Sequence, residues 1–248
     1  MSEVNQVENL TPDVMFDGGD LDCGSGLILL IRESMLKVPV GGILEMRSSE
    51  PTVAGDLPPW CRMVGHEYLG RMDEDRFVRY FVRRGEKAAG QEEKNLRQDK
   101  QRAREYEWRV RTRSTGRLKS TVYCRNFSWH VGQPASFEEK DDYPSSVEYL
   151  LGALGGALAT GYAMECARDG LEMDDIEITV RGKLHNVLVQ VGLEEGDPSF
   201  SSIELKCFAS TLDDEDAARA AWERTVSRSP LAATLAKAVE LKIKFGIV

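Results

Sequence analysis

Five cysteines are the residues of this chain best suited to covalent chemistry. They are scattered through the 248 residues, odd in number, and no two form a Cys-x-x-Cys pair. This usage is typical of free thiols in a reducing compartment and not of a disulfide framework. The chemistry to look for is therefore that of single thiols, at Cys23, Cys61, Cys124, Cys166 and Cys207.

Cys23 lies in the glycine-rich loop 21–26, directly before an apolar segment that begins at Leu27. Ser25 is a suitable N-cap for a helix over that segment, which would end before Pro39. The exposed N–H groups and the dipole at the start of a helix lower the pKa of a nearby thiol. The position therefore predicts a reactive thiol at Cys23.

Two observations limit the choice of thiol. Asp20 and Asp22 lie close to Cys23 and would oppose thiolate formation, and a loop cysteine is often only a small residue, so an unreactive Cys23 stays open. Cys124 is the secondary candidate, because the neighbouring Arg125 would favour a thiolate. Adjacent residues on a strand point to opposite faces, however, which weakens this pairing.

The remaining cysteines and the histidines predict no metal or cofactor site. Cys61 follows an aromatic residue and Cys207 alternates with apolar residues, so both are expected in the core. His66, His130 and His185 are far apart, without metal-ligand spacing. The glycines before residue 27 do not form a phosphate loop, which would continue as Gly-Lys-Ser/Thr or follow the GxGxxG pattern. We expect no cofactor and no metal.

Composition narrows the class of protein. A hydrophobic content of 42% supports a globular core, and the formal net charge of -9 argues against general nucleic-acid binding. No basic segment followed by an apolar run begins the chain, so we expect a cytoplasmic protein. Residues 149–164 carry no charge, but this stretch is shorter than the roughly 20 residues that cross a bilayer. The segment therefore predicts a buried central helix and no membrane contact.

The first 85 residues predict a small two-layer α+β domain with alternating strands and helices. Val78, Tyr80 and Val82 face one way on an alternating strand, as in a half-buried sheet. Pro58 and Pro59 interrupt the second helical stretch and blur its limits. The expected elements are a helix from 27 to about 38, a strand over 42–46, a helix over 52–65 and a strand over 76–84.

Residues 86–105 differ in character from both flanks. They hold six Lys/Arg and five Asp/Glu, good helix formers, and Leu96 as a rare large apolar residue. Mixed charge without aromatic residues favours a solvated helical linker over a nucleic-acid contact.

Strands dominate again in residues 106–248, the larger domain. Gly170 is a suitable C-cap for the apolar helix, and Asp213 begins another helix. The expected strands are 106–112, 119–126, 127–131, 176–184, 187–193, 203–209 and 239–247; the expected helices are 145–168, one from 213 and one after Pro230.

Residues 143–157 read YPSSVEYLLGALGGA and resemble the central helix of the OsmC and organic-hydroperoxide-resistance superfamily. The family pattern is close to Gly-Pro-Ser-Pro-x-Glu-Leu-Leu-Leu-Ala-Ala-Leu-x-Ala-Cys. Residues 222–230 similarly resemble its second motif, an amphipathic helix that ends in Cys-Pro. The resemblance implies antiparallel sheets around two central helices, a homodimer, and a role for Glu148, which often pairs with an arginine in that family.

The family's two cysteines are missing from this chain. In family members with peroxidase activity, the first thiolate attacks the peroxide and the second thiol condenses with the resulting sulfenic acid. Their positions are Ala157 and Ser229 here, and neither side chain can perform these steps. Cys166 lies nine residues beyond Ala157, roughly 13 Å along a helix, too far to replace the first thiol. Two-cysteine peroxidase activity is therefore predicted absent.

The N-terminal domain resembles the TusA/SirA-like sulfur carriers. In that family a Cys-Pro-x-Pro motif at the start of the first helix carries a persulfide. The ungapped alignment places the family cysteine on Gly24 and the prolines on Ser25 and Leu27, with Cys23 one residue away. The residues that support the resemblance are Ile31, Arg32, Glu33, Pro39, Gly41, Pro51, Asp56, Leu57, Pro58, Trp60, Cys61, Gly65 and His66.

These observations favour sulfur trafficking. Cys23 would accept and pass on a persulfide, as a sulfurtransferase-like protein with a sulfur-relay partner does. The non-peroxidatic OsmC-like half would supply dimerisation and a ligand pocket. Two alternatives remain open: a non-catalytic binding or scaffold protein, and a thiol peroxidase that uses another cysteine.

Overall fold

The computed structural model of the chain describes residues 7, 10–22, 24, 26–86, 89–134 and 142–247. They form two compact units, each with its own core. The first comprises the residues up to Tyr106 together with Ala167–Gly170, and the second comprises Glu107–Cys166 and Leu171–Val248. The two units are described separately.

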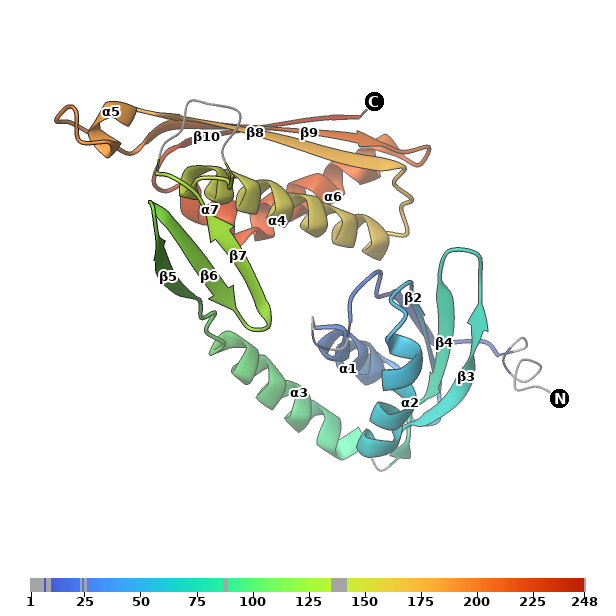
Figure 1. Cartoon of the computed structure of the whole chain (residues 1–248). Helices are drawn as coiled ribbons and strands as arrows, with labels where there is room; N and C mark the ends of the chain where they lie inside the picture. The colour runs from blue at the N-terminus through green and yellow to red at the C-terminus, as the bar shows by residue number, and fades with distance from the viewer. Residues whose placement is uncertain are drawn as a thin grey trace. The chain divides into compact units, whose positions relative to one another are not determined.

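The first unit is a four-stranded sheet with two helices on one face (Figure 1). The sheet order is β1-β2-β4-β3, in which β1 runs parallel to β2 and the other neighbours are antiparallel. The elements in chain order are β1 (Val14–Asp17), α1 (Leu27–Lys37), β2 (Ile43–Ser48), α2 (Val53–Val64), β3 (Glu67–Asp73) and β4 (Val78–Arg83). The sequence had not predicted β1 or β3.

Apolar residues at helical spacing fix both helices onto the sheet. Leu27, Ile31 and Met35 recur every four residues on α1 and are buried. The helix begins after Gly26, whose φ of 106° is accessible to glycine at little cost. The helix α2 continues through its two internal prolines, which the sequence had read as an interruption. Its buried face, which includes Leu57 and Trp60, outweighs the hydrogen bonds that the prolines remove.

The other face of this sheet buries a charge. Glu45 on β2 is 0% exposed, and its carboxylate accepts hydrogen bonds from Arg79 Nε at 2.9 Å and Nη2 at 2.7 Å. Arg47 Nε donates to the same carboxylate at 3.3 Å. Val7, from the chain before β1, is buried and lies against Gly70. A buried carboxylate is tolerated when it is paired in this way.

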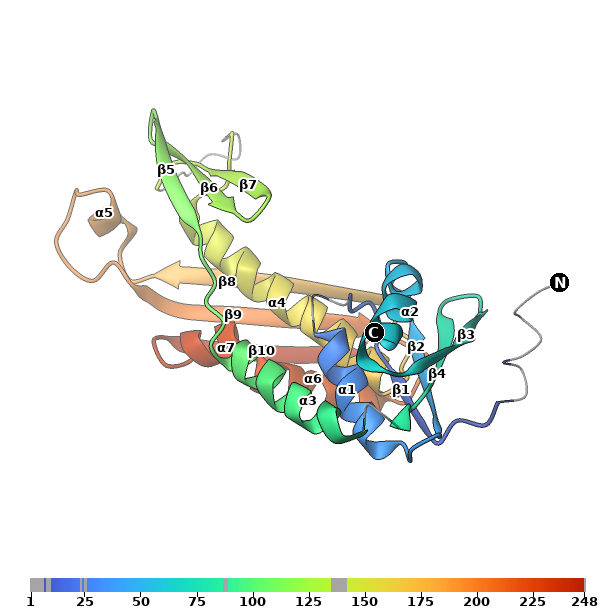
Figure 2. The same ribbon diagram turned by 90° about the horizontal axis from the view of Figure 1, so that it is seen from below.

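The charged helix is packed on the first unit. The predicted helix over 86–105 is present as α3 (Ala89–Arg104), and it lies along α1 (Figure 2). Leu96 is buried, while Asp99 forms an ion pair with Arg32 at 3.2 Å. A second ion pair joins Lys100 to Glu33 of α1 at 3.6 Å. The sequence suggested a solvated linker because one buried apolar residue and two ion pairs leave almost no periodic signal.

The second unit contains two three-stranded sheets and four helices. The strands β5 (Arg111–Gly116), β6 (Lys119–Cys124) and β7 (Phe127–Val131) form an antiparallel sheet. In the other sheet, of order β10-β9-β8, β8 (Asp175–Leu184) pairs antiparallel with β9 (Phe200–Ser210), and β10 (Glu240–Ile247) runs parallel to β9. The helices are α4 (Ser146–Arg168), α5 (Val187–Gln190), α6 (Glu215–Arg228) and α7 (Pro230–Leu235).

The two long helices α4 and α6 cover one face of the sheet β10-β9-β8 (Figures 1 and 2). Tyr162 of α4, Trp222 of α6 and Phe245 of β10 pack together, with Trp222 and Phe245 stacked at 5.4 Å. Part of the α4 surface is exposed and carries small residues, among them Gly152 and Gly156. None of the helices in the described part of the chain is long and apolar enough to cross a membrane.

The predicted α+β class is confirmed, with three differences in detail. Each unit has one sheet with a parallel pair, β1 with β2 and β10 with β9. For the larger domain, antiparallel sheets were expected. The expected strand over 106–112 begins only at Arg111. The expected strand over 187–193 is wrong: the segment forms α5, capped by the Asn186 side chain, which accepts a hydrogen bond from Leu188 N at 2.9 Å. Short-range capping outweighs the apolar alternation there.

Candidate functional sites

The OsmC resemblance predicts Ala157 and Ser229 as the positions of the family's cysteine pair, and both residues line one pocket. Ala157 on α4 and Ser229 at the junction of α6 and α7 both line a cavity of about 190 Å³. They come from segments more than seventy residues apart, so the fold brings them together as the sequence motifs implied. The other lining residues are Gly161, Met164, Glu165, Thr225, Arg228 and Pro230.

Ser229 is held in place as the N-cap of α7. Its Oγ accepts a hydrogen bond from Ala232 N at 3.2 Å, and the residue is buried. Pro230 follows at the first helical position, where its missing N–H is of no consequence. The serine therefore keeps the turn that a Cys-Pro pair would make, but it supplies a hydroxyl in place of a thiol.

A buried carboxylate forms one wall of this pocket. Glu165 on α4 is 2% exposed and accepts hydrogen bonds from two arginines of α6. Arg224 Nε donates to Oε2 at 3.1 Å, and Arg228 Nη1 donates to Oε1 at 2.6 Å. The sequence analysis missed this triad. Its signal was weak: a glutamate at the end of the apolar stretch and two arginines four residues apart.

Glu148 has a structural role at the start of α4. Its Oε2 accepts hydrogen bonds from Ser145 N at 2.6 Å and Ser145 Oγ at 2.7 Å, while Ser145 Oγ accepts from Glu148 N. This reciprocal pair is a capping box, and the bond from Ser145 N, followed by that from its hydroxyl, lowers the pKa of Glu148. Among the described residues no arginine pairs with Glu148, and the pairing that the family resemblance implies stays a prediction.

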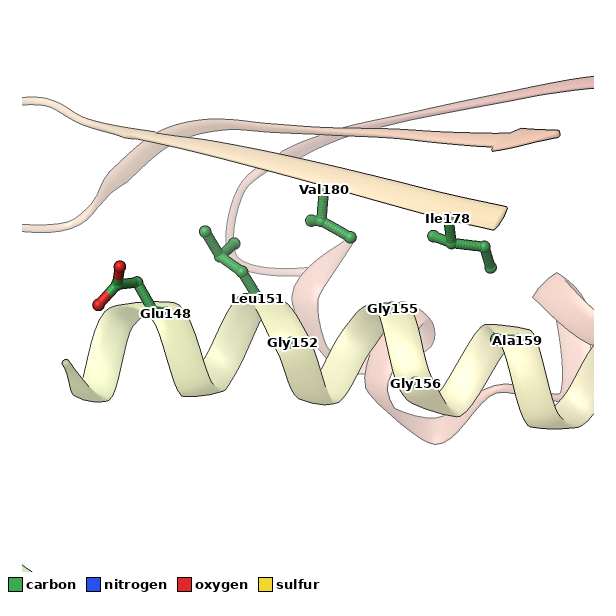
Figure 3. Close-up of a pocket in the computed structure, with 8 residues that line it drawn as sticks. All are labelled: Glu148, Leu151, Gly152, Gly155, Gly156, Ala159, Ile178 and Val180. Atoms are coloured by element: carbon green, nitrogen blue, oxygen red, sulfur yellow. The ribbon is translucent and has the colours of Figure 1, made fainter. Parts of the chain in front are cut away.

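Glu148 also borders a second cavity, a groove of about 440 Å³ between α4 and β8 (Figure 3). Val180 and Ile178 of β8 point toward the helix, opposite its glycines. A Cβ on Gly155 would lie 3.2 Å from Val180 Cγ2, so glycine permits this close approach. Among the described residues that line the groove, Glu148 alone is ionisable, so the groove offers few groups that could take part in a reaction.

The described cysteines divide into buried and half-buried thiols. Cys61 and Cys207 are confirmed as core residues, and burial raises the pKa of each to about 12. Cys166 is buried with Cys207 in the core of the second unit and does not line the pocket of Ala157. Cys124 is half-buried at the end of β6. Its neighbour Arg125 places its guanidinium over the Phe127 ring, at 5.4 Å.

Cys23 and Ser25 lie outside the described residues, and the N-cap of α1 is Gly26, not the expected Ser25. Gly24 and Gly26 on either side of Ser25 are described, and α1 follows directly. The histidines are separate: His66 Nδ1 accepts from Gly85 N at 3.2 Å, His130 lies 3.0 Å from Thr121 Oγ1, and His185 lies 3.8 Å from Asp197. Across the described ranges no three metal-binding side chains cluster.

Residues 139–244 match the family model "OsmC-like protein", so the second unit contains an OsmC-like domain. The N-terminal region is TusA-like. It is 28% identical over 78 residues to the sulfur carrier protein TusA of Pseudomonas syringae pv. syringae. The aligned residues are 32% of this chain and 92% of that protein. A TusA of Pseudomonas putida (strain W619) is 26% identical over 76 residues, which are 31% of this chain and 94% of that protein.

Solved structures with TM-scores below 0.5 are also similar to this chain. An OsmC-like protein from Mycoplasma pneumoniae is similar over 58% of this chain and 98% of its own, at 12% identity and a TM-score of 0.49. An organic hydroperoxide resistance protein OsmC from Legionella pneumophila is similar over 57% of this chain and 97% of its own, at 10% identity and a TM-score of 0.41. The family-model match and the TusA matches confirm both resemblances proposed from the sequence.

Proposed function

We propose that this protein is a persulfide carrier in which Cys23 receives and passes on sulfur, and in which the OsmC-like domain has no peroxidatic role. The absence of a peroxidatic role is supported by the position of Ala157 and Ser229 in one pocket, whose described lining residues include no thiol. The first half is supported by the match to sulfur carriers over 92% of their length.

The proposed transfer needs only one thiol on this chain. The Cys23 thiolate attacks the outer sulfur of a donor persulfide, a new S–S bond forms, and the donor's S–S bond breaks. The donor leaves as a thiolate, and the persulfide proton stays with the transferred sulfur or its surroundings. No net oxidant is consumed, because one persulfide replaces another. In the delivery step, the thiolate of a partner protein of a cytoplasmic sulfur relay would attack the outer sulfur of the Cys23 persulfide, and Cys23 would leave as a thiolate.

Burial of the other thiols supports assigning this role to Cys23. Cys61, Cys166 and Cys207 are enclosed, and burial holds the pKa of Cys61 and Cys207 far above neutrality. A thiol must be exposed and ionised to attack a persulfide. Cys124 is the remaining described candidate, and it serves as the matched control.

Intact-mass spectrometry tests the proposal after incubation with a cysteine desulfurase and L-cysteine. We expect the wild type and Cys124→Ser to gain the mass of one sulfur atom, and Cys23→Ser to gain none. Equal gains by wild type and Cys23→Ser would overturn it. With an organic hydroperoxide and a dithiol reductant, we expect no turnover; consumption that is lost in Cys124→Ser would instead support the alternative peroxidase.

Dimerisation is the second part of the proposed role for the OsmC-like domain. The exposed side of α4 is built from small residues, which allow another helix to approach closely. A homodimer would cover Gly152 and Gly156 on this side. Light scattering after size-exclusion chromatography should give twice the chain mass for the wild type and a monomer for Gly156→Arg.

A binding or scaffold protein is the second candidate function. The retained pocket favours it, since a domain without redox chemistry has kept a cavity at the position of the old active site. A protein of this kind would retain its ligand or partner binding in Cys23→Ser.

A further inference from the structure

We propose that the sheet β5-β6-β7 binds single-stranded RNA, with its phosphates on Arg111, Arg113 and Arg117 and an unpaired base stacked beside Tyr123. This RNA site would be independent of sulfur carriage and of Cys23.

The charges of the chain are unevenly distributed, and this sheet, drawn in green in Figure 1, is basic. Residues 111–131 contain five Lys/Arg and no Asp/Glu, although the whole chain carries a formal net charge of -9. Lys119 forms an ion pair with Asp142. The four arginines of the sheet are exposed and have no carboxylate partner among the described residues: Arg111, Arg113, Arg117 and Arg125. The sheet therefore attracts a polyanion even though the chain is acidic on average.

The strand register places two of these arginines on one face of the sheet. Arg111 lies opposite Tyr123 and Arg113 lies opposite Thr121, and residues paired in this way share a face. The other face carries Val122, which is buried, and its partner Trp129. The sheet is thus amphipathic, and the face with the two arginines is the one that meets solvent.

Tyr123 orients the guanidinium of Arg111. The Cζ of Arg111 lies 4.7 Å from the centroid of the Tyr123 ring, so the guanidinium lies over the ring. This contact uses the flat side of the guanidinium and leaves the N–H donors in its plane for a phosphate. Arginine planes and aromatic rings are also the surfaces on which proteins stack unpaired RNA bases. The pair can therefore bind a phosphate and a base together.

Further phosphate-binding groups follow along the edge strand β5. Residues two apart on a strand are separated by roughly 6.8 Å, which is close to the distance between successive phosphates of an extended nucleic-acid strand. Arg111 and Arg113 have this spacing, and Arg117 follows in the turn between β5 and β6. The strand and its turn thus present three guanidinium groups in succession.

Exposed aromatic rings near the start of β5 favour a partner with unpaired bases. Trp108 is 84% exposed and Phe127, next to Tyr123 in the sheet, is 55% exposed. Such rings stack on the bases of a single strand, whereas the bases of a duplex are already stacked and paired. RNA fits better than single-stranded DNA, because the exposed Ser128 opposite Tyr123 can form a hydrogen bond with a 2′-OH.

Fluorescence anisotropy tests the site with a short labelled RNA that lacks self-complementary sequence, the DNA of the same sequence, and the duplex of that DNA. We expect the RNA to bind, the single-stranded DNA to bind several-fold more weakly, and the duplex to bind about ten-fold or more weakly. The logarithm of the RNA binding constant should fall with the logarithm of the salt concentration at a slope of about −2, since each of three phosphate contacts contributes roughly −0.7.

Arg113→Gln combined with Arg117→Gln should make this slope shallower by about 1.4, because two phosphate contacts are lost. Tyr123→Leu keeps the apolar bulk but removes the ring, and it should weaken RNA binding about five-fold or more. Arg181→Gln combined with Lys183→Gln is the matched control, since it removes the same charge from exposed positions of β8. The control should bind RNA like the wild type.

Amide NMR signals of β5, β6 and β7 should shift when RNA is added to the wild type. Shifts confined to β8, β9 and β10, or equal losses in the two double variants, would overturn the proposal. Tighter binding of the DNA than of the RNA would also overturn it. So would displacement of the RNA by polyglutamate of equal charge, which would assign the surface to an acidic protein segment. Cys23→Ser should bind RNA normally, so RNA binding and sulfur carriage fail separately.

Discussion

Each unit of this protein buries one carboxylate between two arginines, and the two triads differ in what the arginines do next. In the first unit, Arg47 also lies over the Phe77 ring and Arg79 over the Phe81 ring, each with its Cζ 5.3 Å from the ring centroid. In the second unit, Arg228 lies at the rim of a cavity. The first triad is a closed structural cluster. The second combines a fixed carboxylate with a cation that can meet a ligand.

The difference shows why a buried ion pair alone does not identify a functional site. Both carboxylates need their arginines to offset the cost of burial. The second triad contributes Glu165 and Arg228 to a cavity that Ala157 and Ser229, the predicted positions of the cysteine pair, also line. Three perturbations break or sharpen this contrast.

The largest effect should come from the closed triad. Arg79→Met removes both hydrogen bonds from Arg79 to Glu45 and leaves a buried carboxylate with Arg47 alone. We expect the first unit to lose about 3 kcal/mol of unfolding free energy, as when a buried pair is broken. Urea unfolding followed by the amide NMR signals of β2 and β4 measures this loss.

Arg83→Met on the same strand is the control. Arg83 pairs with Glu67 at 2.6 Å, but both side chains are substantially exposed, so its loss should cost less than about 1 kcal/mol. Equal losses for the two variants would show that burial of Glu45 does not set the strength of the pair.

Acid should weaken the first unit through Glu45. Burial by itself would raise the pKa of Glu45, but the hydrogen bonds and charges of Arg79 and Arg47 outweigh it and lower the pKa. A carboxyl with a lowered pKa stabilises the fold above its unfolded pKa of about 4.3, and the contribution is lost as the pH falls through the folded pKa. Urea midpoints at pH 7, 5, 4 and 3 should fall at the acidic end.

Glu45→Gln isolates this contribution, since it removes the titrating group. Its urea midpoint should be lower at pH 7 and should change less between pH 5 and 3 than that of the wild type. An identical pH dependence in both proteins would assign the acid sensitivity to other groups of the first unit.

The smallest effect on stability should come from the open triad. Arg228→Gln leaves Glu165 paired with Arg224, and the Arg228 side chain is largely in solvent. We expect a loss below about 1 kcal/mol, measured by the NMR signals of α4 during urea unfolding. A loss as large as that of Arg79→Met would make the second triad structural as well, and it would remove the basis for a ligand role.

The sequence predicted what depends on local patterns. The long helices, most strands and the positions of Ala157 and Ser229 follow from periodicity and short motifs. The convergence of these two residues was implied only by family resemblance, because no local pattern reports a contact across more than seventy residues.

The sequence missed what depends on tertiary contacts. The triads of Glu45 and Glu165 join residues 34 and up to 63 positions apart, and nothing near either glutamate indicates burial. The packing of α3 on α1 involves buried Leu96 and two long-range ion pairs, Arg32–Asp99 and Lys100–Glu33. The prediction of a strand at 187–193 was wrong because it relied on apolar alternation, which does not report the hydrogen bond from Leu188 N to the Asn186 side chain that caps α5.

The central claim is that covalent chemistry belongs to one thiol in the TusA-like unit and not to the OsmC-like pocket. Peptide-resolved mass spectrometry of the wild-type protein tests it most directly, after sulfur transfer from a cysteine desulfurase and alkylation of all accessible thiols. The account predicts the added sulfur on the peptide of Cys23 and unmodified Cys61, Cys166 and Cys207. Added sulfur on Cys124, or on no cysteine at all, would contradict it.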